Sequence, residues 1–329
     1  RGTVDGDTIF RTDLTGEAAV AVFAHPHIED YRATRDHLVV LVDEDGESAL
    51  IMTDLDGQNP VELTLPGTGY IADLQIADRG ERIGYLFTSA TVGTGSGDES
   101  ALYTASLDTP TADPTKVVVA GADERVAQWS FVPDTDSVLL VAFDGTLLLT
   151  APDGSAPTAL GLALAIDGIA PGTAQAIVER VDGLVVLDLL TGEETPLDVG
   201  DDPAVIGSVM PLPRGGTLRT TLPIADTGLP TGATSVVLVD DAGTSTEVFS
   251  APDTDAVLQT CVSPSGQYAA MLVAPDLASN PYDTYQLPLP ATVETHIVEL
   301  PRGDGSQARE LVALAGSSIS WCRQSVSWR

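Results

Sequence analysis

Lysine is nearly absent from this sequence of 329 residues: Lys116 stands alone beside fourteen arginines, against 48 acidic residues. The formal net charge at pH 7 is −33. Nucleic acids and anionic membrane surfaces both attract basic side chains, so the charge excludes nucleic acid as a partner and direct binding to an anionic membrane surface. Two explanations of the arginine preference stay open, a GC-rich bacterial genome and adaptation to high salt, and we favour the first.

Long apolar runs are also missing. No stretch of about 18 or more uncharged apolar residues occurs, so no segment predicts a membrane-spanning helix. The chain begins at Arg1 rather than at a methionine, and we expect that a signal or anchor segment precedes it.

Helical periodicity is rare, whereas short apolar and β-branched runs bounded by D-G, T-G and G-G turns occur throughout. Examples are H-L-V-V-L-V from His37, S-V-L-L-V-A-F from Ser137 and G-L-V-V-L-D-L from Gly183. Apolar residues make up 43% of the chain, which is enough for a sizeable core. The sequence therefore predicts an all-β fold.

One unit recurs along the chain: an apolar strand ends in an acidic turn, and a second strand follows. It starts at Ile9, Ile51, Leu102, Leu148, Val186, Val237 and Ile297. A period of about 45 residues with four short strands per unit is typical of a β-propeller blade.

A second element, a short strand followed by a turn and an apolar strand, precedes several of these units. One case contains the turn S-P-S-G at Ser263–Gly266, followed by Q-Y-A-A-M-L-V. This turn, together with T-D-L-D-G-Q at Thr53–Gln58, resembles the repeats of the TolB-like (WD40-like) β-propeller family. The resemblance covers nearly the whole chain and implies the architecture, together with an interaction role in the cell envelope.

We therefore expect residues 1–329 to form a single β-propeller of seven four-stranded blades, with six or eight as the alternatives. The run S-S-I-S-W-C-R-Q from Ser317 resembles the first strand of a blade, whereas the chain starts with a third strand. Residues 1–24 and 317–329 are accordingly expected to share the closing blade, because closure removes exposed sheet edges.

Only two cysteines occur, Cys261 and Cys322. Aligned with Trp129-Ser130, they fall at one position of the first strand in consecutive blades, which predicts a disulfide; paired buried thiols and a reactive site are the alternatives. The same alignment predicts that Trp129 and Trp321 pack between blades. A disulfide closing a loop of about 60 residues stabilises by roughly 4 kcal/mol and implies an oxidising compartment. The expected location is extracytoplasmic, either secreted or anchored to the cell membrane through the missing N-terminal segment.

Metal-binding patterns are weak. The stretch H-P-H-I-E-D supplies His25 and His27, and the stretch D-E-D-G supplies Asp43 and Asp45. A calcium site needs about six to eight oxygen ligands, and D-x-D-G is also an ordinary hairpin turn, as is D-L-D-G from Asp54. We therefore expect no metal and no cofactor.

Catalytic motifs are missing too: the sequence contains no G-x-S-x-G, H-E-x-x-H, C-x-x-C or phosphate-binding glycine loop. Ser263 lies in a blade turn with no identifiable base. Whether the chain is an enzyme stays open, with a non-catalytic role favoured.

Three connections between the second and third strands of a blade are long, and they start at Ser89, Pro223 and Ala274. Long loops in compact domains are usually functional or disordered. The Ala274–Thr295 loop carries the predicted partner-binding residues Asn280, Tyr282, Asp283 and Tyr285, although it could also pack on its own blade or be a tolerated insertion.

These features favour a non-catalytic interaction module or scaffold of the bacterial cell envelope, whose partner is an envelope or membrane protein. The alternative is an enzyme or ligand-binding propeller that acts on carbohydrate or peptide in the central channel. Stabilisation by calcium is a third, lesser possibility.

Overall fold

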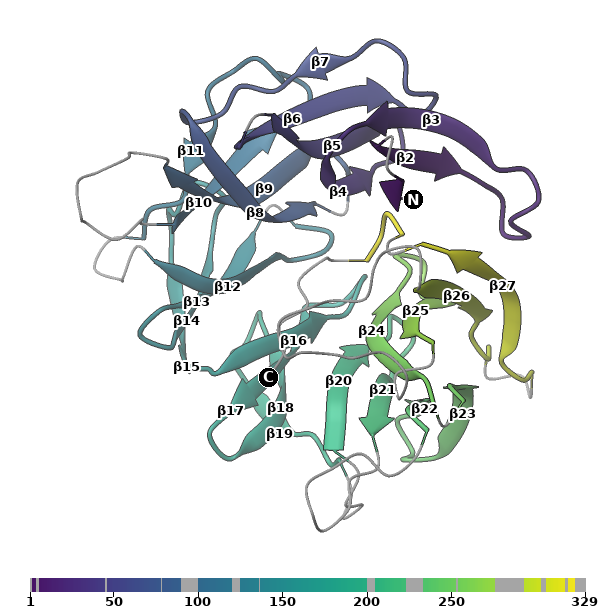
Figure 1. The fold of residues 1–329 in the computed structure, drawn as a ribbon. Coiled ribbons are helices and arrows are strands. Elements are labelled where there is room, and N and C mark those ends of the chain that lie inside the picture. Colours follow the sequence, from purple (N-terminus) through teal and green to yellow (C-terminus); the bar gives the residue numbers. More distant parts are fainter. Residues whose placement is uncertain are drawn as a thin grey trace. The chain divides into compact units, whose positions relative to one another are not determined.

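The computed structural model confirms the all-β class, because all secondary-structure elements in the described part of the chain are β-strands (Figure 1). Among those residues, nothing forms a helix that could cross a membrane. The described residues are 2–3, 6–44, 46–77, 79–89, 100–119, 125–135, 137–199, 205–222, 233–252, 254–275, 293–302, 306–316 and 319–322.

The chain divides into two compact units, which we describe separately: Val22–Leu197, and Arg1–Ala21 together with Asp198–Arg329. The first unit contains four sheets of four strands, each paired antiparallel in chain order. The first sheet consists of β4 (Ile28–Ala33), β5 (His37–Glu44), β6 (Glu47–Asp54) and β7 (Val61–Glu62). The second consists of β8 (Gly69–Ile76), β9 (Arg82–Ser89), β10 (Ser100–Ser106) and β11 (Thr115–Lys116).

The third sheet consists of β12 (Val126–Phe131), β13 (Val138–Ala142), β14 (Thr146–Thr150) and β15 (Thr158–Leu162). The fourth consists of β16 (Ala165–Ile169), β17 (Gln175–Arg180), β18 (Gly183–Asp188) and β19 (Glu194–Pro196). We call each such four-stranded meander a blade.

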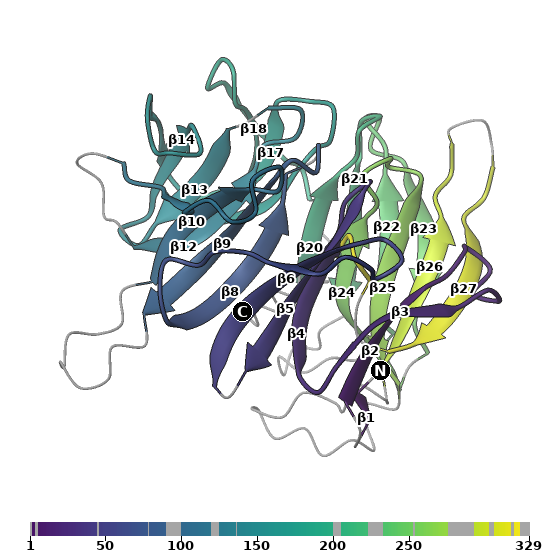
Figure 2. The same cartoon turned by 90° about the horizontal axis from the view of Figure 1, so that it is seen from above.

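The second unit contains two more blades, whose strands run side by side in Figure 2. One consists of β20 (Val205–Pro211), β21 (Thr217–Leu222), β22 (Ser235–Val239) and β23 (Ser245–Ser250). The other consists of β24 (Ala256–Val262), β25 (Tyr268–Ala274), β26 (Glu294–Glu299) and β27 (Arg309–Ala315). The N-terminal strands β1 (Gly2–Thr3), β2 (Gly6–Arg11) and β3 (Val20–His25) form a sheet of three strands.

The described residues thus form six blades, and the prediction of seven is wrong. Six of the seven acidic-turn units lie between the third and fourth strands of a blade as expected, whereas the first lies between β2 and β3 of the three-stranded sheet. We expected the closing blade to take its first strand from residues 317–329. The described residues there, Ile319–Cys322, instead form a turn, in which the Cys322 amide donates to the Ile319 carbonyl at 3.0 Å. Alternation of apolar and polar residues marks a candidate strand, but pairing with a neighbour decides whether one forms.

The hydrophobic core lies between blades. One cluster joins Val39 and Leu50 of the first blade to Leu74, Ile83 and Tyr85 of the second. Further clusters join the second blade to the third, the third to the fourth, and the fifth to the sixth. The second strand of the third blade, β13, is covered on both faces, and its five residues are all apolar and buried.

The first strands of consecutive blades contact each other, β4 with β8, β8 with β12 and β12 with β16. Each of these strands carries a β-bulge, which re-aims the side chains that follow it. A polar side chain then reaches the backbone of the next first strand: Arg32 Nε donates to Leu74 O at 3.0 Å, Gln75 Nε2 to Trp129 O at 2.9 Å, and Gln128 pairs with both Ile166 O at 2.6 Å and Ile166 N at 2.8 Å.

Candidate interaction surface

The tips of two neighbouring hairpins share one local pattern, an apolar residue followed by Asp and Gly. The turn between β13 and β14 is Phe143-Asp144-Gly145, and the turn between β17 and β18 is Val181-Asp182, followed by Gly183 as the first residue of β18. The glycines adopt positive φ, at 86° and 125°, which suits tight connections between strands. In both tips an apolar residue thus stands immediately before a carboxylate.

The segment that links β15 to β16 lies between these two tips. The Ala163 amide donates to the Gly145 carbonyl at 2.8 Å, and the Leu164 amide donates to the Glu179 carbonyl at 2.9 Å. Leu162 and Leu164 flank the buried Ala163 and point their side chains outward. Backbone hydrogen bonds therefore join the three segments into one surface.

Four large apolar side chains on this surface are exposed to solvent: Phe143 by 64%, Leu162 by 68%, Leu164 by 61% and Val181 by 85%. Single exposed apolar residues are normal on a soluble protein, whereas a group on adjoining segments marks an interaction site. We call these four residues the tip surface.

Charged side chains surround the tip surface. Arg125 lies over the Phe143 ring, with Cζ 4.6 Å from its centroid. Arg180 Nη2 donates to Leu160 O at 2.8 Å and forms an ion pair with Glu194 at 2.5 Å, while its Nη1 donates to Leu162 O. The arginines are therefore held against the protein, and Asp144 and Asp182 are exposed beside the apolar tips.

Sequence reasoning missed the tip surface because it ranked connections by length, and both tips are short. The apolar-Asp-Gly pattern between a second and a third strand was the available signal. In the first blade the corresponding turn has Glu44 near Gly46 in place of an apolar residue. The predicted partner-binding residues Asn280, Tyr282, Asp283 and Tyr285, and most of all three long loops, lie outside the described residues.

The structure contains the predicted disulfide. Cys261 and Cys322 are bonded, with their Cα atoms 5.6 Å apart, and both side chains are buried. The alignment that led to this pair is only half right: Cys261 lies on β24, a first strand, whereas Cys322 lies in a turn. Trp129 is buried between the second and third blades as predicted, but Trp321 belongs to the same turn as Cys322.

The weak metal candidates are occupied by turn contacts. His25 Nδ1 accepts from the His27 amide at 3.2 Å, and Asp43 Oδ1 accepts from the Gly46 amide at 2.7 Å. In the part of the chain that the structure describes, which omits Asp45, no three His, Cys, Asp or Glu side chains converge as metal ligands.

The turn D-L-D-G at Asp54–Gly57, a fragment of a calcium loop by sequence, is a hairpin turn. Asp54 Oδ1 accepts from the Asp56 amide at 3.0 Å and the Gln58 amide at 2.8 Å, and Oδ2 accepts from Asn59 Nδ2 at 3.0 Å. The hydrogen bond from the Gln58 amide is the main reason why the pKa of Asp54 is lowered.

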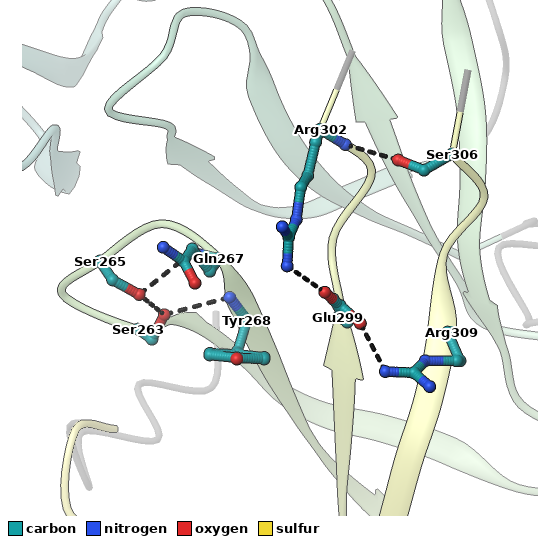
Figure 3. Close-up of polar contacts among 8 residues, drawn as sticks. All are labelled: Ser263, Ser265, Gln267, Tyr268, Glu299, Arg302, Ser306 and Arg309. Carbon is teal, nitrogen blue, oxygen red and sulfur yellow. Dashed lines mark hydrogen bonds and ion pairs between the residues drawn. The ribbon is translucent and has the colours of Figure 1, made fainter. Parts of the chain in front are cut away.

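Ser263 serves the blade turn in which sequence reasoning placed it. Figure 3 shows its hydroxyl accepting from the Tyr268 amide at 3.1 Å and lying 3.1 Å from Ser265 Oγ. Nearby, Arg302 and Arg309 both point to Glu299, at 2.5 and 2.8 Å, and these two hydrogen bonds lower the pKa of Glu299. Among the described residues, no hydrogen bond joins Ser263 to a side chain that could act as a base.

A buried polar cluster lies between the first two blades. Arg32 Nη1 pairs with Asp30 at 2.5 Å, and both side chains are buried. Burial raises the pKa of Asp30 to about 6; Arg32 opposes this shift and Asp73 adds to it. Gln75 donates to both carboxylate oxygens of Asp73. These groups bind one another and the backbone, so the cluster holds blades together.

No protein-family model matches the chain, and no curated protein matches it in sequence. Solved structures do share its fold. The WD40 domain of Toxoplasma gondii coronin is 12% identical over 87% of this chain and 70% of its own, with a TM-score of 0.51. Kuenenia stuttgartiensis hydrazine synthase is 10% identical over 84% of this chain and 77% of its own, with a TM-score of 0.52.

A puromycin-hydrolyzing peptidase of Mycobacterium tuberculosis is 14% identical over 96% of this chain, which spans 48% of the peptidase chain, with a TM-score of 0.58. At such low identities the likeness shows the fold alone. The chain therefore has a WD40-like β-propeller fold. Its membership of the TolB-like family stays a prediction.

Proposed function

We propose that this chain is a non-catalytic, extracytoplasmic β-propeller that binds a protein of the bacterial cell envelope. The tip surface carries this proposal: four exposed apolar side chains on three hydrogen-bonded segments of a chain with a net charge of −33. Burial of such side chains against a partner removes apolar area from water, which drives protein association.

The disulfide supports the location. Disulfides form and persist in oxidising compartments and are rare in the cytosol. The buried bond between Cys261 and Cys322 therefore favours a protein that folds outside the cytoplasm, either secreted or anchored by a preceding segment.

The alternative, an enzyme or ligand binder that uses the central channel, finds less support. Carboxylates and arginines accessible to a substrate would support this alternative. Asp30 and Arg32, however, are buried and paired with each other. The Mycobacterium tuberculosis protein is named as a peptidase, and at 14% identity its activity does not transfer to this chain.

The test is affinity capture from a cell-envelope extract of the organism that makes the protein. The bait variants are Phe143→Ser/Val181→Ser and, as the matched control, Leu190→Ser. Leu190 is 82% exposed in the turn after β18, at the opposite end of that strand from Val181. We expect a specific protein to be captured by the wild type and by Leu190→Ser and lost with the double variant.

A further bait with the Ala274–Thr295 loop replaced by Gly and Ser tests whether Asn280, Tyr282, Asp283 and Tyr285 form a second contact. Capture that is identical with all baits, or that fails with all of them, contradicts a protein-binding role of the tip surface.

A further inference from the structure

We propose that His296 and Glu294 form a binding site for a divalent transition-metal ion, of which zinc fits best. The inference goes beyond the proposed function and does not depend on it, because these residues lie on the sixth blade, whereas the tip surface belongs to the third and fourth. It rests on the orientation of one imidazole ring and on the distance between two ligand atoms.

The geometry of the strands brings three side chains together. Glu294 and His296 lie two residues apart on β26, so their side chains stand on the same face of the blade. Glu310 lies on the neighbouring strand β27, which pairs with β26 (Figure 1). Phe249 of the fifth blade packs against the His296 ring, with the two ring centroids 5.0 Å apart. The imidazole is therefore held in place between two blades.

A hydrogen bond to Glu310 sets the chemical state of the ring. His296 Nδ1 lies 2.8 Å from Glu310 Oε1, and an ionised carboxylate can only accept, so Nδ1 carries the proton. In the neutral ring the other nitrogen, Nε2, then carries a lone pair. Metal-binding histidines usually donate their second ring N–H to a carboxylate in this way, which fixes the ring and makes the free nitrogen a better ligand.

The free nitrogen faces a second carboxylate. His296 Nε2 lies 3.5 Å from Glu294 Oε2. Two atoms with lone pairs repel each other unless a cation stands between them, and that cation can be a proton or a metal ion. A proton would draw the two atoms to the roughly 2.7–2.9 Å of a charge-assisted hydrogen bond. Two ligand atoms at about 2.1 Å from a tetrahedral zinc ion stand about 3.4 Å apart, so the separation fits the metal.

The donor types and the surroundings also suit zinc. Zinc binds imidazole nitrogen as well as carboxylate oxygen, whereas magnesium and calcium prefer oxygen alone. Within the described residues no three His, Cys, Asp or Glu side chains converge on one ion, so the protein supplies two ligands and water supplies the others. The side chains of Glu294 and Glu310 are 50% and 49% exposed, so an ion reaches the site from solvent. The net charge of −33 raises the local concentration of cations.

The test is isothermal titration calorimetry with zinc chloride at pH 7, in excess magnesium chloride, which occupies sites made of carboxylates alone. The proteins are the wild type, His296→Gln, Glu294→Gln, Glu310→Ala and, as the matched control, His25→Gln. His25 belongs to the stretch H-P-H, the weak metal candidate of the sequence, so this control also locates the ion. Equal melting temperatures without zinc check that the variants fold.

We expect one zinc ion to bind the wild type. Binding should be lost with His296→Gln, weaken by about ten-fold or more with Glu294→Gln and by about 10- to 100-fold with Glu310→Ala, and change by less than about two-fold with His25→Gln. The effect of Glu310→Ala separates a metal site from a plain ion pair, because Glu310 orients the ring without touching the ion.

Nitrogen-15 NMR of the four histidine rings gives a second readout. Zinc should shift the Nε2 resonance of His296 and leave those of His25, His27 and His37 in place. If zinc leaves the His296 resonances unchanged, the inference is wrong, and protons on both ring nitrogens at pH 7 would show that a proton bridges the pair. If zinc binds His296→Gln as tightly as the wild type, or is lost with His25→Gln, the ion lies elsewhere and the inference fails as well.

Discussion

The backbone carbonyl of Val22 occupies the space that a side chain on Gly57 would need. Val22 lies on β3, the outer strand of one sheet, and Gly57 lies in the turn between the third and fourth strands of the next sheet. The same relationship recurs between Val118 and Gly154. The glycine of the repeated acidic turn is thus required where neighbouring sheets touch.

The first prediction compares two glycines in equivalent turns. Gly57 and Gly243 have φ of 76° and 81°, and the aspartate at the start of each turn accepts the same pair of backbone hydrogen bonds. Only Gly57 has a neighbour within reach of a new side chain. Gly243→Ala should cost about 1 kcal/mol and Gly57→Ala roughly 3 kcal/mol or more in the free energy of unfolding, measured with urea. Equal losses would show that the contact with Val22 is not important.

The second prediction concerns the disulfide, which closes a loop with a sequence separation of 61 residues. In the chain-entropy model such a bridge stabilises the folded state by about 4 kcal/mol. Thermal unfolding of the wild type should shift to lower temperature in reductant, and Cys261→Ser/Cys322→Ser should melt at that lower temperature whether or not reductant is present. An unchanged melting temperature of the double variant would contradict the prediction.

The third prediction is a pH dependence with a definite sign. The pKa of Asp30 is about 6 in the folded state, chiefly through burial, against an ordinary value of 3.8. A raised pKa means that the folded state binds the proton more tightly, so this contribution is fully present below pH 4 and is lost as the pH rises through 6. The size is about 3 kcal/mol.

The measurement is the free energy of unfolding of the wild type and of Asp30→Asn between pH 4 and pH 7. The difference, wild type minus variant, should fall as the pH rises, because the variant has no proton to lose at this position. A difference that rises with pH would mean that Arg32 stabilises the carboxylate more than burial destabilises it.

The fourth prediction is a stabilising substitution. The Tyr85 hydroxyl is buried in the core between the first two blades and has no hydrogen-bond partner among the described residues, and burial raises its pKa. A buried hydroxyl without a partner destabilises, so Tyr85→Phe should raise the free energy of unfolding by up to about 1 kcal/mol. Tyr70→Phe, at an exposed position, serves as the control and should have no effect. A loss of stability with Tyr85→Phe would reveal a partner for the hydroxyl.

The local elements of the fold could be predicted from the sequence, but the number of blades could not. Turn chemistry is local, so D-L-D-G at Asp54–Gly57 and S-P-S-G at Ser263–Gly266 formed the expected turns. Blade closure depends on pairing between distant segments. The run through Trp321 has the apolar pattern of a strand but forms a turn, held by a local hydrogen bond and by the disulfide of Cys322.

The candidate site was likewise predicted only in part. The cysteine pair could be found because only two cysteines exist, even though Cys322 lies in a different element from the one expected. The tip surface was missed: the apolar-Asp-Gly pattern marks each turn separately, and only the hydrogen bonds of Ala163 and Leu164 bring the turns of Phe143 and Val181 together. The contacts between blades through Gln75 and Gln128 likewise depend on β-bulges, which the residue pattern does not predict.

The most direct test of the central claim is photo-crosslinking to the partner. A photoreactive residue placed at Leu162, and for comparison at Leu190, would be activated in the envelope extract, and the crosslinked peptides identified by mass spectrometry. The account predicts that Leu162 crosslinks to a segment of one envelope protein, and that Leu190 does not. The same products from both positions, or none from Leu162, would contradict it.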